Sequence, residues 1–151
     1  MISSRAKYAT RAILDLAAHE GVKPVQIHDI ADRQNIPLKF LEQILLGLKS
    51  AGFVSSRKGP GGGYRLAMPA EKIMLGAVVR SMDGPLSPIS CVSVTAYHEC
   101  GCPDPDRCAL RLAWKEARDA LASVLDGVSF AQLKSDQERL LDLPPIIDYE
   151  I

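Results

Sequence analysis

The stretch Gly52-Phe-Val-Ser-Ser-Arg-Lys-Gly-Pro-Gly-Gly-Gly-Tyr-Arg-Leu-Ala67 decides the fold of this chain of 151 residues. Residues 53–58 and 64–67 have the length and composition of two short strands. The loop between them, residues 59–63, contains four glycines and one proline, and glycine adopts the positive φ angles of a tight loop without a steric penalty. The stretch therefore predicts a β-hairpin with a glycine-rich tip.

The residues before this hairpin predict three helices. Apolar side chains recur at helical spacing over residues 4–20, 26–34 and 37–51. Asn35 suits a left-handed cap at the end of the second helix, and Pro37 suits the first turn of the third. Two helices joined by a short turn and followed by a hairpin form a winged helix-turn-helix. The predicted fold class is therefore mostly α, with three helices and a two-stranded wing.

Two other functions of the glycine-rich loop fit the residues less well. A loop that cradles a nucleotide phosphate leads into a helix, whereas here a strand follows, and Tyr64 stands where a dinucleotide fingerprint needs its last glycine. A plain hairpin turn does not need four glycines flanked by Arg57, Lys58 and Arg65. We therefore expect a DNA-binding wing, which lies along the DNA backbone or enters the minor groove.

The second half of the chain predicts a long helix that joins two subunits. Residues 75–82 predict a fourth helix, and residues 106–126 predict the long one. Apolar residues at alternating spacings of four and three form a coiled-coil seam along it: Leu110, Trp114, Ala117, Leu121 and Val124. A separate apolar face of the same helix can pack on its own domain, so we expect the seam to face a second copy. Burial of the whole helix within one monomer is the alternative.

These elements divide the chain into four parts. We expect a DNA-binding domain over residues 1–84 and a cysteine-rich sensor loop over residues 85–105. A dimerisation helix with a short C-terminal helix packed back on it is expected over residues 106–143. The tail, residues 144–151, begins Pro-Pro and is expected to be mobile.

Composition and charge agree with a DNA-binding protein of the cytoplasm. The sequence has no apolar run of 18 residues and no signal-peptide pattern, so we expect a cytoplasmic protein without a membrane partner. The formal net charge is zero, but residues 1–66 carry ten Lys or Arg against five Asp or Glu, and residues 67–151 carry eight against thirteen. The first part can therefore meet a polyanion, although an uneven spread of solvated charges is the simpler alternative.

All four cysteines lie within the 18 residues 91–108, here called the cysteine loop. In a reducing compartment such a cluster indicates a metal, iron-sulfur or redox site more than structural disulfides. The spacing C-x8-C-x-C-x5-C contains no C-x2-C pair, which disfavours a zinc ribbon or a thioredoxin-type dithiol. An iron-sulfur cluster accepts thiolates at irregular spacing from one loop and fits best. Free cysteines in a flexible loop are the remaining alternative.

Three motifs resemble the IscR/NsrR family of bacterial winged-helix regulators: Leu41-Glu-Gln-Ile-Leu, then Gly52 to Tyr64, then Cys102-Pro-Asp-Pro-Asp-Arg-Cys108-Ala-Leu-Arg-Leu-Ala-Trp. The resemblance covers nearly the whole chain. It implies a homodimeric transcription regulator, such as a repressor, whose loop cluster senses iron-sulfur supply, redox stress or nitric oxide. It also implies cluster ligation by Cys91, Cys102 and Cys108, with a [2Fe-2S] cluster favoured over [4Fe-4S].

The fourth cluster ligand departs from the family pattern. The IscR branch has a histidine three residues after the last cysteine, where this chain has Arg111, which is no metal ligand. The NsrR branch uses an acidic residue on the first helix, and here Lys7 stands beside Tyr8. Cys100 is our first candidate, because it lies in the same loop and a thiolate binds iron well. The alternatives are His98, Asp104, Asp106 and an external ligand.

A winged helix places its third helix in the major groove of DNA. In this chain the third helix carries polar side chains opposite its apolar stripe, among which Gln43 suits adenine and Glu42 can accept from cytosine. Basic residues of the wing and of the first helix suit phosphates or the minor groove. The expected DNA contacts, on a palindromic operator, are Arg5, Lys39, Glu42, Gln43, Arg57, Lys58, Gly61, Gly62 and Arg65.

Two rival functions remain. A clusterless regulator of the same fold would use the cysteines as a thiol switch, as the CymR branch of the family implies. A metal or redox enzyme would need catalytic machinery, but the sequence has no H-E-x-x-H motif. His19 and His28 are better explained as helix-end or surface residues. We therefore predict that the protein is not an enzyme.

Overall fold

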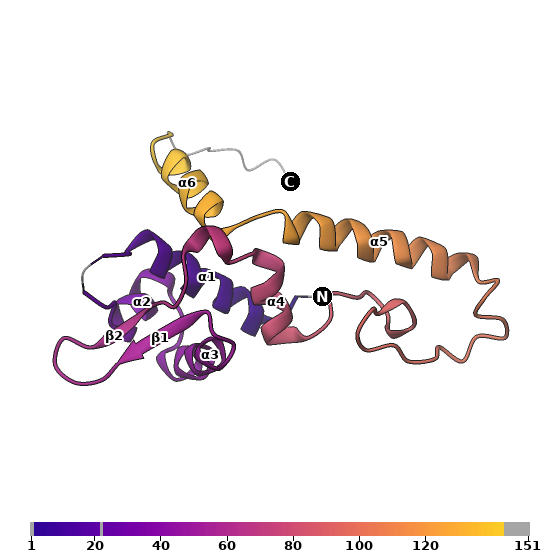
Figure 1. Cartoon of the computed structure of the whole chain (residues 1–151), viewed down its shortest axis with the longest axis horizontal. Coiled ribbons are helices and arrows are strands. Elements are labelled where there is room, and N and C mark those ends of the chain that lie inside the picture. The colour runs from indigo at the N-terminus through magenta and orange to yellow at the C-terminus, as the bar shows by residue number, and fades with distance from the viewer. Residues whose placement is uncertain (1, 22, 144–151) are drawn as a thin grey trace.

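The structure, a computed structural model, describes residues 2–21 and 23–143. The predicted mobile tail lies outside the described residues. The elements in chain order are α1 (Ser4–Ala18), α2 (Ile27–Gln34), α3 (Leu38–Ser50), β1 (Val54–Arg57), β2 (Gly63–Leu66), the 3-10 turn η1 (Ala70–Lys72), α4 (Leu75–Asp83), the 3-10 turn η2 (Ser90–Val92), α5 (Ala109–Asp126) and α6 (Phe130–Leu141). The predicted winged helix-turn-helix with a long C-terminal helix is confirmed (Figure 1).

Helix α1 forms the centre of the core because its inner face is built largely from small residues. Ala9 and Ala12 are fully buried, and helices α3 and α4 both pack against α1. Alanine leaves room for these neighbours to come close, and larger side chains from the neighbours fill the core. The stripe on α3 is wholly buried: Leu41, Ile44, Leu45 and Leu48. The predicted inward face of α3 is therefore confirmed.

A buried carboxylate ties α2 to α1. The Asp15 side chain is only 1% exposed and accepts two hydrogen bonds from Arg33, at 3.0 and 2.7 Å, and one from the amide of Gln34 at 3.0 Å. Arg11 of α1 also donates to the backbone carbonyl of Gln34. The bonds with Asp15 raise the pKa of the Arg33 guanidinium above its ordinary value. Because both partners lie at the end of α2, these contacts fix where α2 ends and the turn to α3 begins. Asn35 makes that turn with the predicted left-handed conformation, at φ 48°.

The wing is pinned to the rest of the domain by a pairing that the sequence did not predict. Strands β1 and β2 pair antiparallel from Val54 opposite Leu66 to Arg57 opposite Gly63. Tyr64 of β2 also exchanges two backbone hydrogen bonds with Val25, at 2.8 and 2.7 Å. Val25 lies in the turn before α2, so the wing and the helix-turn-helix share one rigid base.

Helix α5 projects from the winged domain, and the cysteine loop runs beneath it (Figure 1). Only Leu125 of α5 is buried. The helix begins at Ala109 instead of residue 106, since Asp104 accepts a hydrogen bond from the backbone of Arg107 and holds a turn there. None of the described helices combines the length and apolar character needed to cross a membrane.

Helix α6 packs against α1 and η1, so the expectation that it packs back on α5 is wrong. The reason is Phe130, the first residue of α6, whose side chain is fully buried in the core of the winged domain. Backbone bonds from Leu75 to Val128 and from Phe130 to Ile73, each 2.9 Å, hold the chain there. The C-terminal helix is thus part of the winged domain in space.

We predict that Arg33→Ala lowers the free energy of unfolding by about 2–3 kcal/mol, because it leaves the buried Asp15 carboxylate without its charged partner. Urea denaturation followed by circular dichroism measures this value. The matched control is Arg139→Ala, which removes an arginine that is 73% exposed and paired with Asp136, and which should cost less than about 0.5 kcal/mol. Equal losses in the two variants would contradict the structural role of Asp15.

Candidate nucleic-acid interface and cysteine pocket

The outward face of α3 carries the polar side chains predicted from the sequence. Lys39, Glu42 and Gln43 are all exposed, and the core stripe lies on the opposite side of the helix. We call this surface the reading face. None of the three makes a hydrogen bond or ion pair with another described residue. Their donors and acceptors are therefore available to base edges in a major groove.

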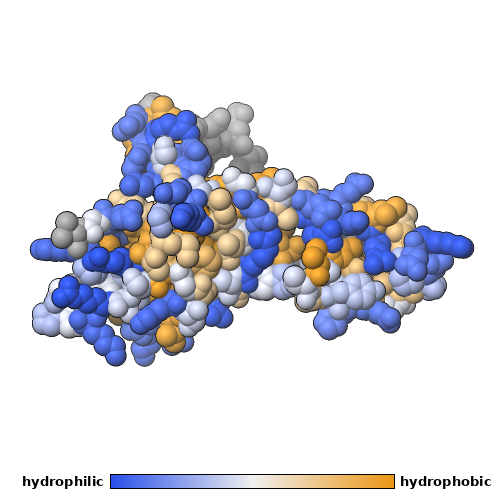
Figure 2. All heavy atoms as spheres, viewed as in Figure 1, coloured by the Kyte–Doolittle hydropathy of each residue, from blue (hydrophilic) through white to orange (hydrophobic). Residues whose placement is uncertain are grey.

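Cations surround the reading face. The Arg5 guanidinium lies beside Gly47 of α3, where a side chain larger than hydrogen would crowd it. On the wing, Arg57, Lys58 and Arg65 are exposed. Figure 2 shows hydrophilic residues gathered over this end of the molecule, at the lower left. Glu42 is the only acid predicted on this surface. The surface is therefore strongly cationic and complementary to a polyanion.

Lys49 is a further basic residue that the sequence reasoning missed. It stands in the last turn of α3, and its Nζ donates a 2.7 Å hydrogen bond to the hydroxyl of Ser56 on β1. The contact adds a side-chain link between α3 and the wing. A lysine at the end of the third helix was the available signal, but the pairing with β1 depends on the tertiary structure.

The two wing glycines named in the sequence have different surroundings. Gly61 is exposed with φ 71°, a conformation that L-residues with side chains rarely adopt. A Cβ atom on Gly62 would collide with the backbone carbonyl of Arg57, and the Gly62 amide bonds to the Gly59 carbonyl at 2.9 Å. Gly62 therefore closes the wing tip whether or not it also touches DNA.

Three of the four cysteine thiols interact directly, and the fourth lies within electrostatic range. Cys91 is buried and Cys100 is exposed, while Cys102 and Cys108 are half-buried. Hydrogen bonding with Cys102 lowers the pKa of the Cys100 thiol, and the same bond raises the pKa of Cys102 to about 11. Burial raises the pKa of Cys91, and its hydrogen bond with Cys100 adds to this. Cys108 acts electrostatically on Cys102. Cys91, Cys100 and Cys102 thus influence one another's pKa values, and Cys108 adds its charge.

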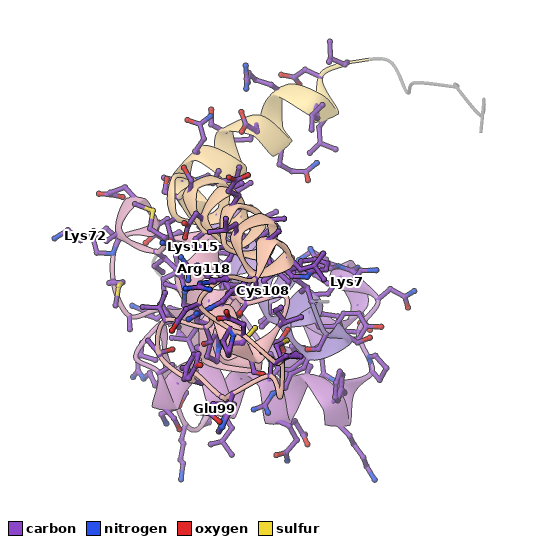
Figure 3. The ribbon with its side chains drawn as sticks, turned by 90° about the vertical axis from the view of Figure 1, so that its right-hand side faces the viewer. Lys7, Lys72, Glu99, Cys108, Lys115 and Arg118 are labelled. Atoms are coloured by element: carbon purple, nitrogen blue, oxygen red, sulfur yellow. The ribbon has the colours of Figure 1, made fainter. Side chains whose placement is uncertain are left out.

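A pocket of about 390 Å³ opens between the cysteine loop and α5, and Cys91 and Cys108 both line it. Lys115 and Arg118 of α5 line this pocket together with Cys108, and all three are labelled in Figure 3. Arg118 donates to the carbonyl of Val92 at 2.5 Å, and Lys115 has no partner among the described residues. Cations therefore line the same pocket as Cys91 and Cys108, and the charge of Arg111 favours the thiolate form of Cys91.

Arg111 also lines this pocket, at the position where the resemblance has a ligand. Its Nη1 donates to the carbonyl of Pro105 at 3.1 Å and lies 3.5 Å from Asp106. Its guanidinium stacks over the ring of Tyr97, with 5.8 Å to the ring centroid. The residue thus fastens the loop to α5 and opposes the raised pKa of Cys91 by its charge.

The alternatives for a fourth ligand lack the interaction with other cysteine thiols that Cys100 has. His98 and Cys100 are both exposed and neither lines the pocket, but only Cys100 interacts with Cys91 and Cys102. Asp104 pairs with Arg107, at 3.8 Å, and Asp106 pairs with Arg111. Within residues 2–21 and 23–143, no three His, Cys, Asp or Glu side chains gather as ligands of a single metal ion.

The predicted seam of α5 is exposed in the single chain. Leu110 is 71% exposed and Val124 is 65% exposed. Trp114, Ala117 and Leu121 are exposed as well. Figure 2 shows apolar residues interspersed with hydrophilic ones over the right-hand part of the molecule, where α5 and the cysteine loop lie. An apolar surface of this extent marks an interaction site in a soluble protein.

This architecture defines a winged-helix DNA-binding regulator with a cysteine pocket beside its long helix. The family model Rrf2, described as an iron-dependent transcriptional regulator, matches residues 2–136. The chain belongs to the Rrf2 family. It is a transcription regulator that binds DNA and is not an enzyme, as predicted.

Individual relatives agree with this family. The chain is 36% identical over 137 residues to the HTH-type transcriptional regulator IscR of Aliivibrio salmonicida. The aligned residues cover 91% of this chain and 79% of the relative. A solved structure of T. potens IscR is 28% identical with a TM-score of 0.77, covering 96% of this chain and 93% of the other. The structure of CymR, the global cysteine regulator of B. subtilis, is 31% identical with a TM-score of 0.76, covering 89% and 96%.

We predict that Cys100 is alkylated at least about tenfold faster than Cys102 near pH 8 in the reduced, cluster-free protein. The lowered pKa makes Cys100 a thiolate at lower pH, and the raised pKa of Cys102, about 11, keeps its proton bound. The lower nucleophilicity of a low-pKa thiolate offsets only part of this difference. Iodoacetamide labelling with mass spectrometry across pH measures both rates. The rates should converge in urea, and equal rates in the folded protein would contradict the thiol arrangement.

Proposed function

We propose that this protein is a homodimeric regulator that senses iron-sulfur status, redox stress or nitric oxide through a cluster held by the cysteine loop. The observation that carries the proposal is the gathering of four thiols on one loop under α5, beside the pocket that Cys91 and Cys108 line. Such a cluster, when bound, supplies a group that changes charge on electron transfer and is dismantled by oxidants.

The chemistry of the residues present fits this group. Cys91, Cys102 and Cys108 would hold it, with Cys100 as the fourth ligand, and a [2Fe-2S] cluster is favoured. From Ser93 to Cys108 the loop contains no helix or strand, so no backbone ladder prevents it from closing around a group. Lys115 and Arg118 offset the negative charge that several thiolates accumulate, since opposite charges nearby favour the ionised thiols.

A short series of contacts links the cysteine loop to the DNA-binding domain. Arg118 of α5 bonds to the backbone of Val92, next to Cys91. Eight residues further along α5, Asp126 accepts two bonds from Arg80 of α4, at 2.6 and 2.8 Å. Helix α4 in turn packs against α1 and α3. A change in the loop can therefore reach the reading face through two rigid helices.

The exposed seam of α5 supports the homodimer. Two copies paired along α5 present two reading faces together, as a palindromic operator requires, about 10 base pairs apart or a multiple of that. On each face Gln43 would bond to adenine and Glu42 would accept from cytosine. Arg57 and Lys58 of the wing would neutralise phosphates, a contribution that weakens as salt rises.

A clusterless thiol switch is the second candidate. The pKa of Cys100 is linked to those of both Cys91 and Cys102, so these two thiols are its candidate disulfide partners. Oxidation to a disulfide would release two protons and two electrons to an oxidant such as a peroxide. The similarity to CymR, a cysteine regulator, is compatible with this alternative.

We predict that anaerobically purified protein contains iron and acid-labile sulfide, and that Cys100→Ala loses most of both. Operators selected from random duplex DNA should bind the cluster-loaded and cluster-free forms with affinities that differ at least about fivefold at equal salt. His98→Ala is the matched control and should retain the cluster. Protein without iron and sulfide whose DNA affinity changes on peroxide treatment would support the thiol switch instead.

We also predict that Leu110→Glu separates the dimer. Each dimer buries two copies of this leucine, so the dissociation constant should rise by roughly a hundredfold or more. Analytical ultracentrifugation measures the change. Leu140→Glu is the matched control, since Leu140 is 58% exposed but lies on α6, and its dimer should be unchanged. A wild-type chain that sediments as a monomer at micromolar concentration would overturn the proposed dimer.

A further inference from the structure

One residue of the reading face is neither polar nor charged. Leu46 of α3 is 58% exposed, although the other leucines at the centre of this helix, Leu41, Leu45 and Leu48, are fully buried. An apolar patch is visible at the lower edge of the molecule, over α3 (Figure 2). The side chain of Leu46 is therefore exposed to water on a surface whose other residues are polar or cationic. An apolar partner at this position would remove it from water.

The helical geometry places Leu46 at the middle of the reading face. It follows Lys39 by seven residues, Glu42 by four and Gln43 by three, so all four lie on one side of α3. At 100° per residue, Leu46 points within about 30° of the direction opposite to the buried stripe. Its neighbour Gly47 makes room for the Arg5 guanidinium, which suits a phosphate. Leu46 is thus enclosed by groups that fit DNA.

The apolar surface that serves the dimer lies elsewhere. Figure 1 shows α3 on the underside of the winged domain, whereas α5 projects from the other side. The exposed seam residues, such as Leu110 and Val124, all belong to α5. Leu46 is therefore separate from the seam, and a partner at Leu46 must be compatible with the cations around it.

The major groove of DNA offers one apolar group to such a side chain, the C5-methyl group of thymine. We propose that Leu46 reads a thymine methyl group in the operator, which makes it a specificity-determining residue beside Gln43. This inference rests on the proposed function of the reading face. Leu46 lies about 4.5 Å beyond Gln43 along the helix axis, a little more than one base-pair step. The thymine is therefore within one or two base pairs of the adenine that Gln43 contacts.

The test replaces thymine by uracil, which removes only the methyl group. Each thymine of a selected operator half-site is replaced in turn, and affinity is measured at constant salt for wild type and Leu46→Ala. At the thymine that Leu46 contacts, replacement by uracil should lower the affinity of wild type about fourfold, because one buried methyl group is lost. Leu46→Ala should bind the thymine operator more weakly than wild type does and should show no further loss with uracil.

Leu140→Ala is the matched control, because Leu140 has the same exposed fraction, 58%, but lies on α6. It should keep the full uracil penalty. Wild type that is insensitive to uracil at every thymine, or an equal penalty in Leu46→Ala, would overturn the assignment while leaving DNA binding intact. A lower dimer affinity in Leu46→Ala with unchanged uracil sensitivity would assign the residue to a protein contact instead. Failure to select any operator would overturn the proposed function as well.

Discussion

The buried carboxylate of Asp15 sets the geometry on which the rest of the DNA-binding surface depends. A buried charge is tolerated only when its oxygens are hydrogen-bonded and its charge is paired, and Arg33 and Gln34 at the end of α2 meet both needs. Their positions fix the end of α2, and Asn35 then turns the chain into α3. The direction of the reading face follows from this contact, since only three residues, 35–37, separate the end of α2 from the start of α3.

The reading face and the cysteine loop lie in separate parts of the molecule. The winged domain buries the stripe of α3 and the start of α6, and it points the polar side of α3 outward. The cysteine loop and α5 extend away from that core, with little of α5 buried. Arg118 joins α5 to the cysteine loop, and the Arg80–Asp126 pair joins α5 to α4 of the winged domain. Because packed helices move as rigid bodies, a shift of α5 would be passed on to α4 through this ion pair and the packing around it.

Much of the fold could be predicted from the residues alone. The helical spacing of Leu41, Ile44, Leu45 and Leu48 predicts the inner face of α3, because apolar residues on one side of a helix pack against the core. The glycines of the wing reveal its tip, since few other residues accept those φ angles. The pairing of Val25 with Tyr64 and the bond from Lys49 to Ser56 could not be predicted. Val25 and Tyr64 are far apart in the chain, whereas Lys49 and Ser56 belong to a helix and a strand with different orientations. No local sequence pattern encodes either contact.

The sequence by itself determined the class of the protein. Local rules of helix spacing, turn chemistry and cysteine spacing operate within a few residues, so they specify the winged helix, the cysteine loop and the apolar seam. Only the tertiary structure decided how these parts meet. It packed α6 on α1 through Phe130, drew Cys91 and Cys108 to one pocket with the cations of α5, and left Leu46 exposed among polar neighbours. Burial and long-range contact depend on the whole chain, which is why these features appear only in the folded protein.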